Sequence, residues 1–238
     1  MTLFDMIKNP NAYLGLGAGI YDGLNSIHVM GYNSDIDNGT EPETIWNGGG
    51  LYPWSAFATA GTLDVSSDSL SESLSVVLDG LDANYQPIQE TVTLSGTTPV
   101  TTTNSFIRLN KMTCTSLNIG AITADKGVTV GKVDAGQGSS MSGIYTVPAG
   151  HTAFLLCGDA TAQKGRDAQI RFYARYFGMG FVVAHMAETY QNFYRYDFPI
   201  PIKLPEKTDL DVRVFEVETS GTRVTCNFDL ILDNRVAY

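Results

Sequence analysis

The sequence of 238 residues has few charged side chains, and basic ones are scarcest. Only 17% of its residues are Asp, Glu, Lys or Arg, below the usual fraction of about 25%. The 25 acidic residues outnumber the 15 basic ones, which gives a net charge of −10. Such a chain is repelled by nucleic-acid phosphates and by anionic membrane surfaces. The charge therefore predicts a protein that binds neither nucleic acid nor a membrane.

Long apolar segments are also missing. No run approaches the roughly 18 apolar residues of a membrane-spanning helix. The N-terminal stretch MTLFDMIKNPNAYLG carries an acid early and has no extended apolar core, so we expect no secretory signal.

Cysteine and histidine are rare and scattered. The three cysteines and three histidines are Cys114, Cys157, Cys226, His28, His151 and His185. No CxxC or HxxxH pair occurs, whereas a zinc site usually needs about four ligands in close pairs. An odd number of distant cysteines argues against a disulfide framework and suits folding in a reducing cytosol. We expect no cofactor.

Motifs of catalysis and of calcium binding are incomplete. No GxSxG nucleophile elbow is present. The acidic loop from Asp35 to Glu43 has Gly39 at its fifth position and Thr40 at its sixth, where an EF-hand needs glycine. A looser calcium site, a solvated loop and a loop that docks on a basic partner all stay open. A glycosidase pair of carboxylates also stays open, because the fold sets the distance between them. We expect a protein that is not an enzyme.

What the sequence does contain is alternation typical of strands. In TRVTCNFDLILD, residues 222–233, apolar side chains from Val224 to Leu232 share one parity and polar ones share the other. Residues 168–177 and 208–217 alternate in the same way, with Asp209, Asp211 and Arg213 on the polar side. Many short strands with turns between them predict an all-β fold, an antiparallel β-sandwich or jelly roll with an extended N-terminal arm.

The stretch around His151 is also predicted to form a strand, here after a turn. Pro148 and Gly150 form a turn, after which His151, Leu155 and Cys157 share the parity of one strand. Cys157 is therefore predicted to be a small core side chain.

The chain is expected to divide near residue 60. Residues 1–60 form an N-terminal arm and a long loop rich in Trp and Gly, and residues 61–238 form the sandwich. Apolar side chains of the arm and both tryptophans of the loop are the candidate partner-binding residues: Leu3, Phe4, Met6, Ile7, Trp46 and Trp54. An aromatic stretch, Arg171 to Ile200, is interpreted as core and subunit contact; stacking on sugars or bases is the alternative.

Several segments together resemble a known family. They are IHVMGYNSDID with ETIWNGGGLYPW, GLDANYQPIQETVTLSG with SFIRLNKM, IYTVPAGHTAFL, and PIKLPEKTDLDVRV. Their order resembles uncharacterised virion structural proteins of tailed bacteriophages, especially marine ones. The resemblance implies a particle component and offers no catalytic residues.

These observations favour a capsid decoration or cement protein. It would form a homotrimer on the capsid surface, bridge copies of the major capsid protein and pass through the host cytoplasm during assembly. A tail or fibre component that binds host-surface carbohydrate is the alternative. A polysaccharide-degrading enzyme has only the abundance of carboxylates in its favour.

Overall fold

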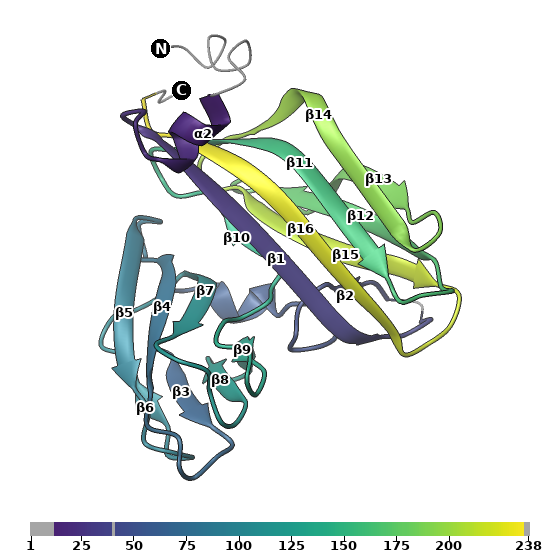
Figure 1. Ribbon diagram of the computed structural model, residues 1–238. Coiled ribbons are helices and arrows are strands. Elements are labelled where there is room, and N and C mark those ends of the chain that lie inside the picture. Colours follow the sequence, from purple (N-terminus) through teal and green to yellow (C-terminus); the bar gives the residue numbers. More distant parts are fainter. Residues whose placement is uncertain (1–11, 40, 236–238) are drawn as a thin grey trace.

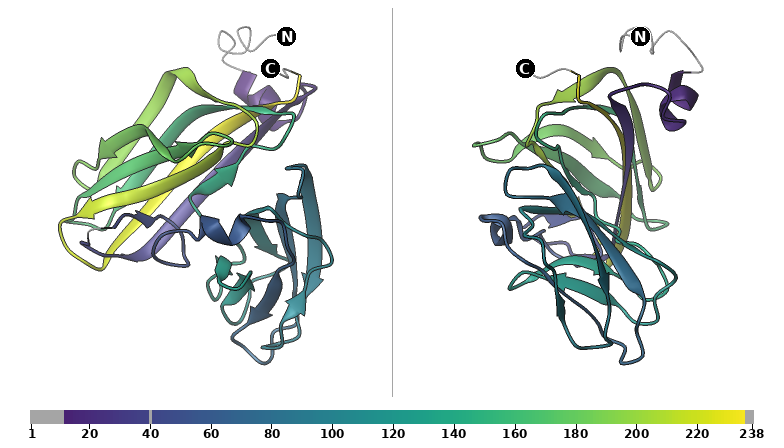
Figure 2. Two further views of the ribbon diagram at one scale, coloured as in Figure 1. Left: turned by 180° about the vertical axis from the view of Figure 1, so that it is seen from behind. Right: turned by 90° about the vertical axis from the view of Figure 1, so that its left-hand side faces the viewer.

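The computed structural model describes residues 12–39 and 41–235, and strands dominate them (Figure 1). The strands pair antiparallel throughout the described ladders, so the protein has an all-β fold. Two large hydrophobic cores lie among these described residues, each built from two sheets. Figure 2 shows the two resulting sandwiches from two further sides.

The first sandwich combines the start of the chain with its C-terminal part. One sheet has the order β1-β16-β11-β14, and the other has the order β10-β15-β12-β13, with β2 also paired to β15. The strands are β1 (Leu24–Ile36), β2 (Glu43–Thr44), β10 (Ile144–Thr146), β11 (Thr152–Ala162), β12 (Ala168–Arg175), β13 (Val182–Glu188), β14 (Phe193–Leu204), β15 (Asp209–Val217) and β16 (Thr222–Asp233).

Strand β16 confirms the predicted alternation. Val224, Cys226, Phe228 and Leu230 are all buried, and they pack in the first core. The strand lies between β1 and β11, so both of its backbone edges are hydrogen-bonded. A central strand with one apolar face is what the sequence pattern predicts.

The second sandwich is inserted between β2 and β10. Its sheets have the orders β6-β3-β8-β9 and β5-β4-β7. The strands are β3 (Asp64–Ser67), β4 (Ser75–Leu81), β5 (Pro87–Thr93), β6 (Val100–Thr101), β7 (Arg108–Cys114), β8 (Ile122–Asp125) and β9 (Thr129–Val133). A hairpin connects β4 to β5, and within it Asp82 N–H donates to the carbonyl of Gln86 at 2.9 Å.

The expected division near residue 60 differs from this arrangement. Strand β1 lies inside residues 1–60, yet it pairs with β16 along nearly its whole length. Residues 61–238, expected as one sandwich, instead contribute to two cores. The first sandwich therefore combines strands from both sides of the insertion, whereas the second uses the consecutive strands β3 to β9.

The expectation for Cys157 is wrong. A bulge lies between Leu155 and Cys157 on β11 and reverses the alternation, so that Ala160 faces the core instead. Cys157 is half-buried, and its thiol donates to Oδ2 of Asp229 at 3.3 Å. Burial, together with the nearby Asp229 carboxylate, raises the pKa of this thiol to about 11. A thiol with a raised pKa is a poor nucleophile at neutral pH.

The N-terminal part of the described chain begins with the short helix α2 (Ala12–Gly17). Its Leu16 packs in a small cluster with Leu24 and Ile231 at one end of the first sandwich. The expected apolar arm residues Leu3, Phe4, Met6 and Ile7 lie outside the described residues. Among the described residues, no helix is long and apolar enough to cross a bilayer.

Candidate functional site

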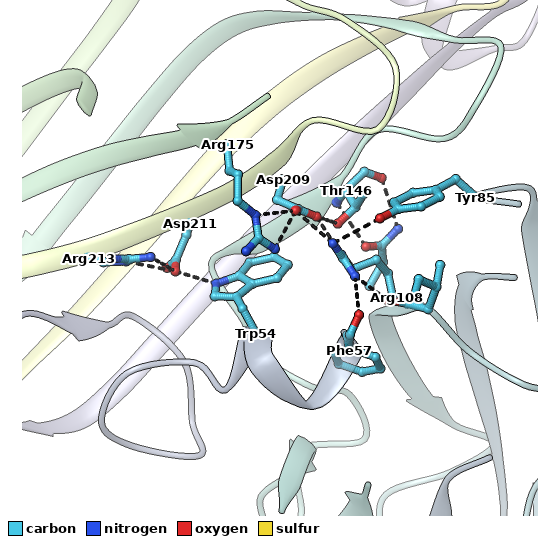
Figure 3. A network of polar contacts seen from close by, with 11 residues as sticks. Trp54, Phe57, Tyr85, Arg108, Thr146, Arg175, Asp209, Asp211 and Arg213 are labelled. Atoms are coloured by element: carbon cyan, nitrogen blue, oxygen red, sulfur yellow. Dashed lines mark hydrogen bonds and ion pairs between the residues drawn. The ribbon is translucent and has the colours of Figure 1, made fainter. Parts of the chain in front are cut away.

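Buried charges join the two sandwiches at Asp209. This residue begins β15 in the first sandwich, and Arg108 reaches it from β7 in the second (Figure 3). Arg108 Nε donates to Oδ1 of Asp209 at 2.7 Å, and its Nη2 donates to Oδ2 at 3.0 Å. Arg175, at the end of β12, donates from Nε to the same Oδ2 at 2.8 Å. One carboxylate therefore serves two guanidinium groups.

The Nη1 group of Arg108 also has hydrogen-bond acceptors. It donates to the carbonyl oxygens of Phe57 at 3.2 Å and Ile107 at 2.6 Å. Burial opposes the charge of Arg108, but the hydrogen bonds and charge of Asp209 outweigh it, so the pKa of Arg108 is raised. The guanidinium stays charged, and the pair ties β7 to β15 in a fixed geometry.

A second buried carboxylate, Asp211, lies two residues along β15. Trp54 of the 3-10 helix η1 (Trp54–Phe57) donates from Nε1 to its Oδ2 at 2.7 Å. Thr44 donates to Oδ1 at 2.9 Å, and Arg213 donates from Nε to Oδ2 at 2.9 Å. Burial raises the pKa of Asp211, and Arg213 and the hydrogen bonds oppose that rise. Both faces of β15 are thus occupied, one by the first core and one by the junction.

A pocket of about 300 Å³ opens beside this junction. Its lining includes Arg108, Arg175, Lys207, Asp209, Tyr85 and Phe177. Tyr85 and Phe177 meet edge to face with ring centroids 5.8 Å apart. Nζ of Lys207 lies 4.9 Å from the centroid of the Phe177 ring. The pocket therefore combines cationic groups with an aromatic rim.

The edge of the first sandwich formed by β13 and β14 is a different kind of surface. We call it the open edge. Each of the two strands pairs on one side only, as the last strand of its sheet. Large apolar side chains there are 41% to 85% exposed: Val182, Val183, Met186, Phe193, Tyr196 and Ile200. A group of exposed apolar residues on one edge is typical of a protein contact surface.

An aromatic cluster fills the mouth between the two sheets at the open edge. The ring centroid of His185 on β13 lies 5.3 Å from that of Tyr196 and 5.3 Å from that of Phe198, both on β14. The Nε2 atom of His185 lies 2.7 Å from the hydroxyl of Tyr194. Burial lowers the pKa of His185. Behind the cluster lies an apolar cavity of about 50 Å³ against Phe172 and Phe228.

Two prolines shape the open edge. Pro199 and Pro201 lie in β14 where its ladder with β11 is interrupted, between Asp197 and Ile202. Proline has no N–H to donate, and prolines on an edge strand discourage an incoming strand. The open edge therefore offers side chains for contact more than a continuous backbone ladder.

A groove of about 900 Å³ separates the two sandwiches along β1. Both His28 and His151 line it, but each ring has a nearby partner. Nδ1 of His28 lies 2.6 Å from Oδ1 of Asp229, and Nδ1 of His151 lies 3.1 Å from the carbonyl of Ala149. Across residues 12–39 and 41–235, no group of three or more His, Cys, Asp or Glu side chains is placed to hold a metal ion.

The acidic loop before β2 is organised by Glu43. Its Oε1 accepts the N–H of Asp37 at 2.7 Å, and its Oε2 accepts the N–H of Gly50 at 3.1 Å. Glu43 therefore closes the loop through the backbone. Carboxylate bonds to backbone N–H groups are a common structural use of such residues.

The tryptophans expected to be surface anchors are interior residues. Trp46 is 3% exposed and Trp54 is 7% exposed, and both belong to the second core. Tyr52 packs edge to face between them, with centroids 5.0 Å and 4.9 Å away. The loop thus builds an internal aromatic cluster, which corrects the expectation that its tryptophans face a partner.

The comparisons with known proteins leave the family of this chain open. No family model matches it, and no curated protein matches it. Two similar solved structures are those of infectious bursal disease virus, strains Gx and Gt. Each match covers 90% of this chain and 77% of the viral chain at 12% identity, with TM-scores of 0.19 and 0.18. Likeness at this level carries no argument about fold or function.

Proposed function

We propose that the protein is a non-enzymatic virion structural protein, a capsid decoration or cement protein that bridges major capsid proteins. It would act as a homotrimer on the capsid surface, after assembly in the host cytoplasm. The observation that carries this proposal is the open edge, where Ile200 is 85% exposed and Met186 is 55% exposed. Apolar side chains on a fixed sheet edge lose contact with water when a neighbour covers them, which stabilises assembly.

We further propose that the first sandwich is a jelly roll. The strand orders β1-β16-β11-β14 and β10-β15-β12-β13 support it, because they interleave early and late strands as two Greek keys do. Jelly rolls recur in viral capsid and lectin domains, although a fold alone does not define a function. The second sandwich, inserted between β2 and β10, widens the surface that one subunit can cover.

The test is to add purified protein to heads that lack it and to measure binding and resistance to heat or osmotic shock. We expect the wild type to bind and to raise that resistance. Ile200→Asp places a charge on the open edge and should abolish both effects. Leu70→Asp is the matched control, because Leu70 is also 85% exposed but belongs to the second sandwich. Binding by both variants would reject the open edge as the contact surface, and no binding by the wild type would reject the decoration role.

A tail or fibre component that binds host carbohydrate is a second candidate. The exposed rings of Tyr190, Phe193 and Tyr196 favour it, since aromatic faces can pack on sugar rings. Fluorescently labelled protein would then mark host cells and leave undecorated heads unlabelled. The opposite labelling pattern would contradict this candidate.

A further inference from the structure

The pocket beside Asp209 holds more positive than negative charge. Arg108, Arg175 and Lys207 line it, and Asp209 is the carboxylate among its lining residues. Within the described part of the chain, both arginines pair with Asp209, and no ion pair joins Lys207 to a carboxylate. This excess of cations lies in a chain whose net charge is −10. A cationic pocket in an acidic protein is a local feature that an anion would complement.

Backbone conformation supplies a second observation. Tyr85 has a φ of 62° and Lys207 has a φ of 59°, in the left-handed region that favours glycine. Both side chains line this same pocket (Figure 3 shows Tyr85). Non-glycine residues in this region cost conformational energy and cluster at functional sites. Glycine at either position would relax the turn but would remove a side chain from the pocket.

The position of the two accessible cations indicates where an anion would sit. The Arg108 side chain is 8% exposed and is enclosed by its partners, whereas the Arg175 side chain is 25% exposed. Nζ of Lys207 lies over the rings of Tyr85 and Phe177, at 5.8 Å and 4.9 Å from their centroids. A carboxylate between Arg175 and Lys207 would therefore meet two cations that Asp209 alone does not neutralise.

The rest of the lining favours a side chain over a sugar. The walls carry Phe57, Phe177 and Met179. The neutral polar side chains are Ser55, two tyrosines and Trp54, whose indole N–H already donates to Asp211. A sugar ring would bring several hydroxyl groups that need partners, and unpaired buried polar groups are unfavourable. An acidic side chain has an apolar stem and one anionic end, which matches an aromatic rim above a cationic floor.

The geometry points to this pocket as a binding site for the carboxylate of an acidic side chain, Asp or Glu, presented by a partner polypeptide. The inference goes beyond the proposed function, because carboxylate binding can be measured on the isolated chain with no particle present. Failure of head binding would leave it intact, and its own failure would leave the role of the open edge intact.

The test is an NMR titration of the ¹⁵N-labelled protein with N-acetyl-glutamate amide at constant ionic strength. The signals of Trp54 Nε1–H and Arg175 Nε–H report on the pocket. We expect saturable shifts with a dissociation constant on the order of millimolar, as for a ligand of this size. The isosteric neutral compound, N-acetyl-glutamine amide, should give no saturable shift. Absence of saturation with the acidic compound, or equal binding of both compounds, would overturn the proposal.

Substitutions at Lys207 separate binding from folding. Lys207→Gln should weaken binding by at least about tenfold, because a charge-assisted contact is lost. Lys207→Asn should weaken it equally while leaving the thermal midpoint unchanged or higher, because Asn tolerates a positive φ. Lys164→Gln, a matched loss of an exposed charge in the turn before β12, should bind as the wild type does. Unchanged binding by the two Lys207 variants, or equal weakening by Lys164→Gln, would overturn the site.

A second ligand distinguishes the source of the carboxylate. Glucuronate carries the same anionic group on a sugar ring. We expect it to bind at least severalfold more weakly than N-acetyl-glutamate amide, because its hydroxyl groups find few partners in the pocket. Equal or tighter binding of glucuronate would overturn the assignment to a polypeptide partner.

Discussion

The exposed edges of the two sandwiches differ in what they present to water. Strand β5, at the edge of the second sandwich, begins with Pro87 and exposes Gln89. The Glu90 carboxylate on the same strand accepts the N–H groups of Thr103 and Asn104 at 2.7 Å and 2.8 Å. The open edge of the first sandwich instead exposes apolar side chains of β13 and β14. An edge with proline and satisfied polar groups is suited to remain in water, whereas an apolar edge is suited to be covered.

The same comparison extends to the interiors next to these edges. In the first sandwich, the cavity behind His185 reaches Phe172 and Phe228 from the open edge. In the second sandwich, Phe106 and Met112 are fully buried. The first core also contains fully buried side chains such as Leu155 and Leu204, so the cavity marks incomplete closure at the open edge and not throughout that core. A subunit whose open edge is covered by a neighbour in an assembly would have such a cavity.

The largest expected effect is on the first core. Phe228 is 2% exposed and packs edge to face on Phe172, with centroids 5.3 Å apart. Phe228→Ala should lower the free energy of unfolding by about 3–5 kcal/mol. Phe215→Ala is the control, because Phe215 is 38% exposed and stacks with Arg171, so that its loss should cost about 0.5–1 kcal/mol. Urea denaturation measures both, and equal effects would contradict the placement of Phe228 in the core.

The next effect tests the link between the sandwiches. Arg108→Met keeps much of the side-chain volume but removes the hydrogen bonds to Asp209, while Arg175 still neutralises that carboxylate. We expect a loss of about 1.5–3 kcal/mol, typical of hydrogen bonds to a charged group. Arg171→Met is the matched arginine control, because Arg171 on β12 stacks on Phe215 and donates to Gln169, and among the residues that the structure describes it has no bond to Asp209. A stability equal to the wild type in both variants would show that apolar packing at the junction can replace the ion pair.

The sequence predicts the strands better than it predicts the buried charges at the junction between the two sandwiches. The alternation in residues 222–233 predicts β16 correctly, because one face packs on the core and the other does not. Residues 208–217 alternate in the same way, yet Asp209, Asp211 and Arg213 are buried. A charged face on a strand normally indicates solvent, and only the insertion of a second sandwich covers it here. The partners Arg108 and Trp54 come from β7 and η1, which are distant in sequence from β15, so no local signal identifies them.

The tryptophans show a second limit of prediction from sequence, because they are expected at the surface but are buried. A loop rich in Gly and Trp indicates an exposed anchor, but Trp54 is held inside by its bond to Asp211 and Trp46 by packing on Tyr52. The bulge that turns Cys157 outward also has no sequence signature of its own. Partners distant in sequence decide the positions of Trp54 and Cys157: Asp211 on β15 for the first, and the strands paired with β11 for the second. The aromatic stretch from Arg171 to Ile200 contributes Phe172 to the first core but leaves Phe193 and Tyr196 exposed, so its role in subunit contact stays a prediction.

A smaller effect should distinguish the open edge from the edge strand β5. The double variant Pro199→Val, Pro201→Val returns backbone N–H groups to an apolar edge strand, so we expect slow self-association by strand pairing. Pro87→Val makes the same change on β5, where polar neighbours should keep the chain soluble. Light scattering over time at one protein concentration measures both. Association of the β5 variant alone would reverse the distinction drawn between the edges.

The smallest expected effect concerns pH at the open edge. Burial lowers the pKa of His185 from its ordinary value of 6.5, and Tyr194, Tyr196, Phe198 and Asp159 surround it in the cavity lining. Well above pH 6.5 the ring is neutral in both folded and unfolded chains. As pH falls from there toward the lowered pKa, the unfolded chain takes up a proton that the folded chain resists, so stability is lost.

His185→Gln removes this proton linkage. Between about pH 7.5 and about pH 5, the thermal midpoint of the wild type should therefore fall slightly further than that of the variant. Thermal unfolding of both proteins in the same buffers measures the difference, and each protein at the higher pH is its own reference. A variant that falls as far as the wild type would assign the loss to carboxylates elsewhere. A second copy on the open edge would bury His185 further. The difference in thermal midpoint between the wild type and His185→Gln should then widen, so the smallest effect also reports on the contact surface.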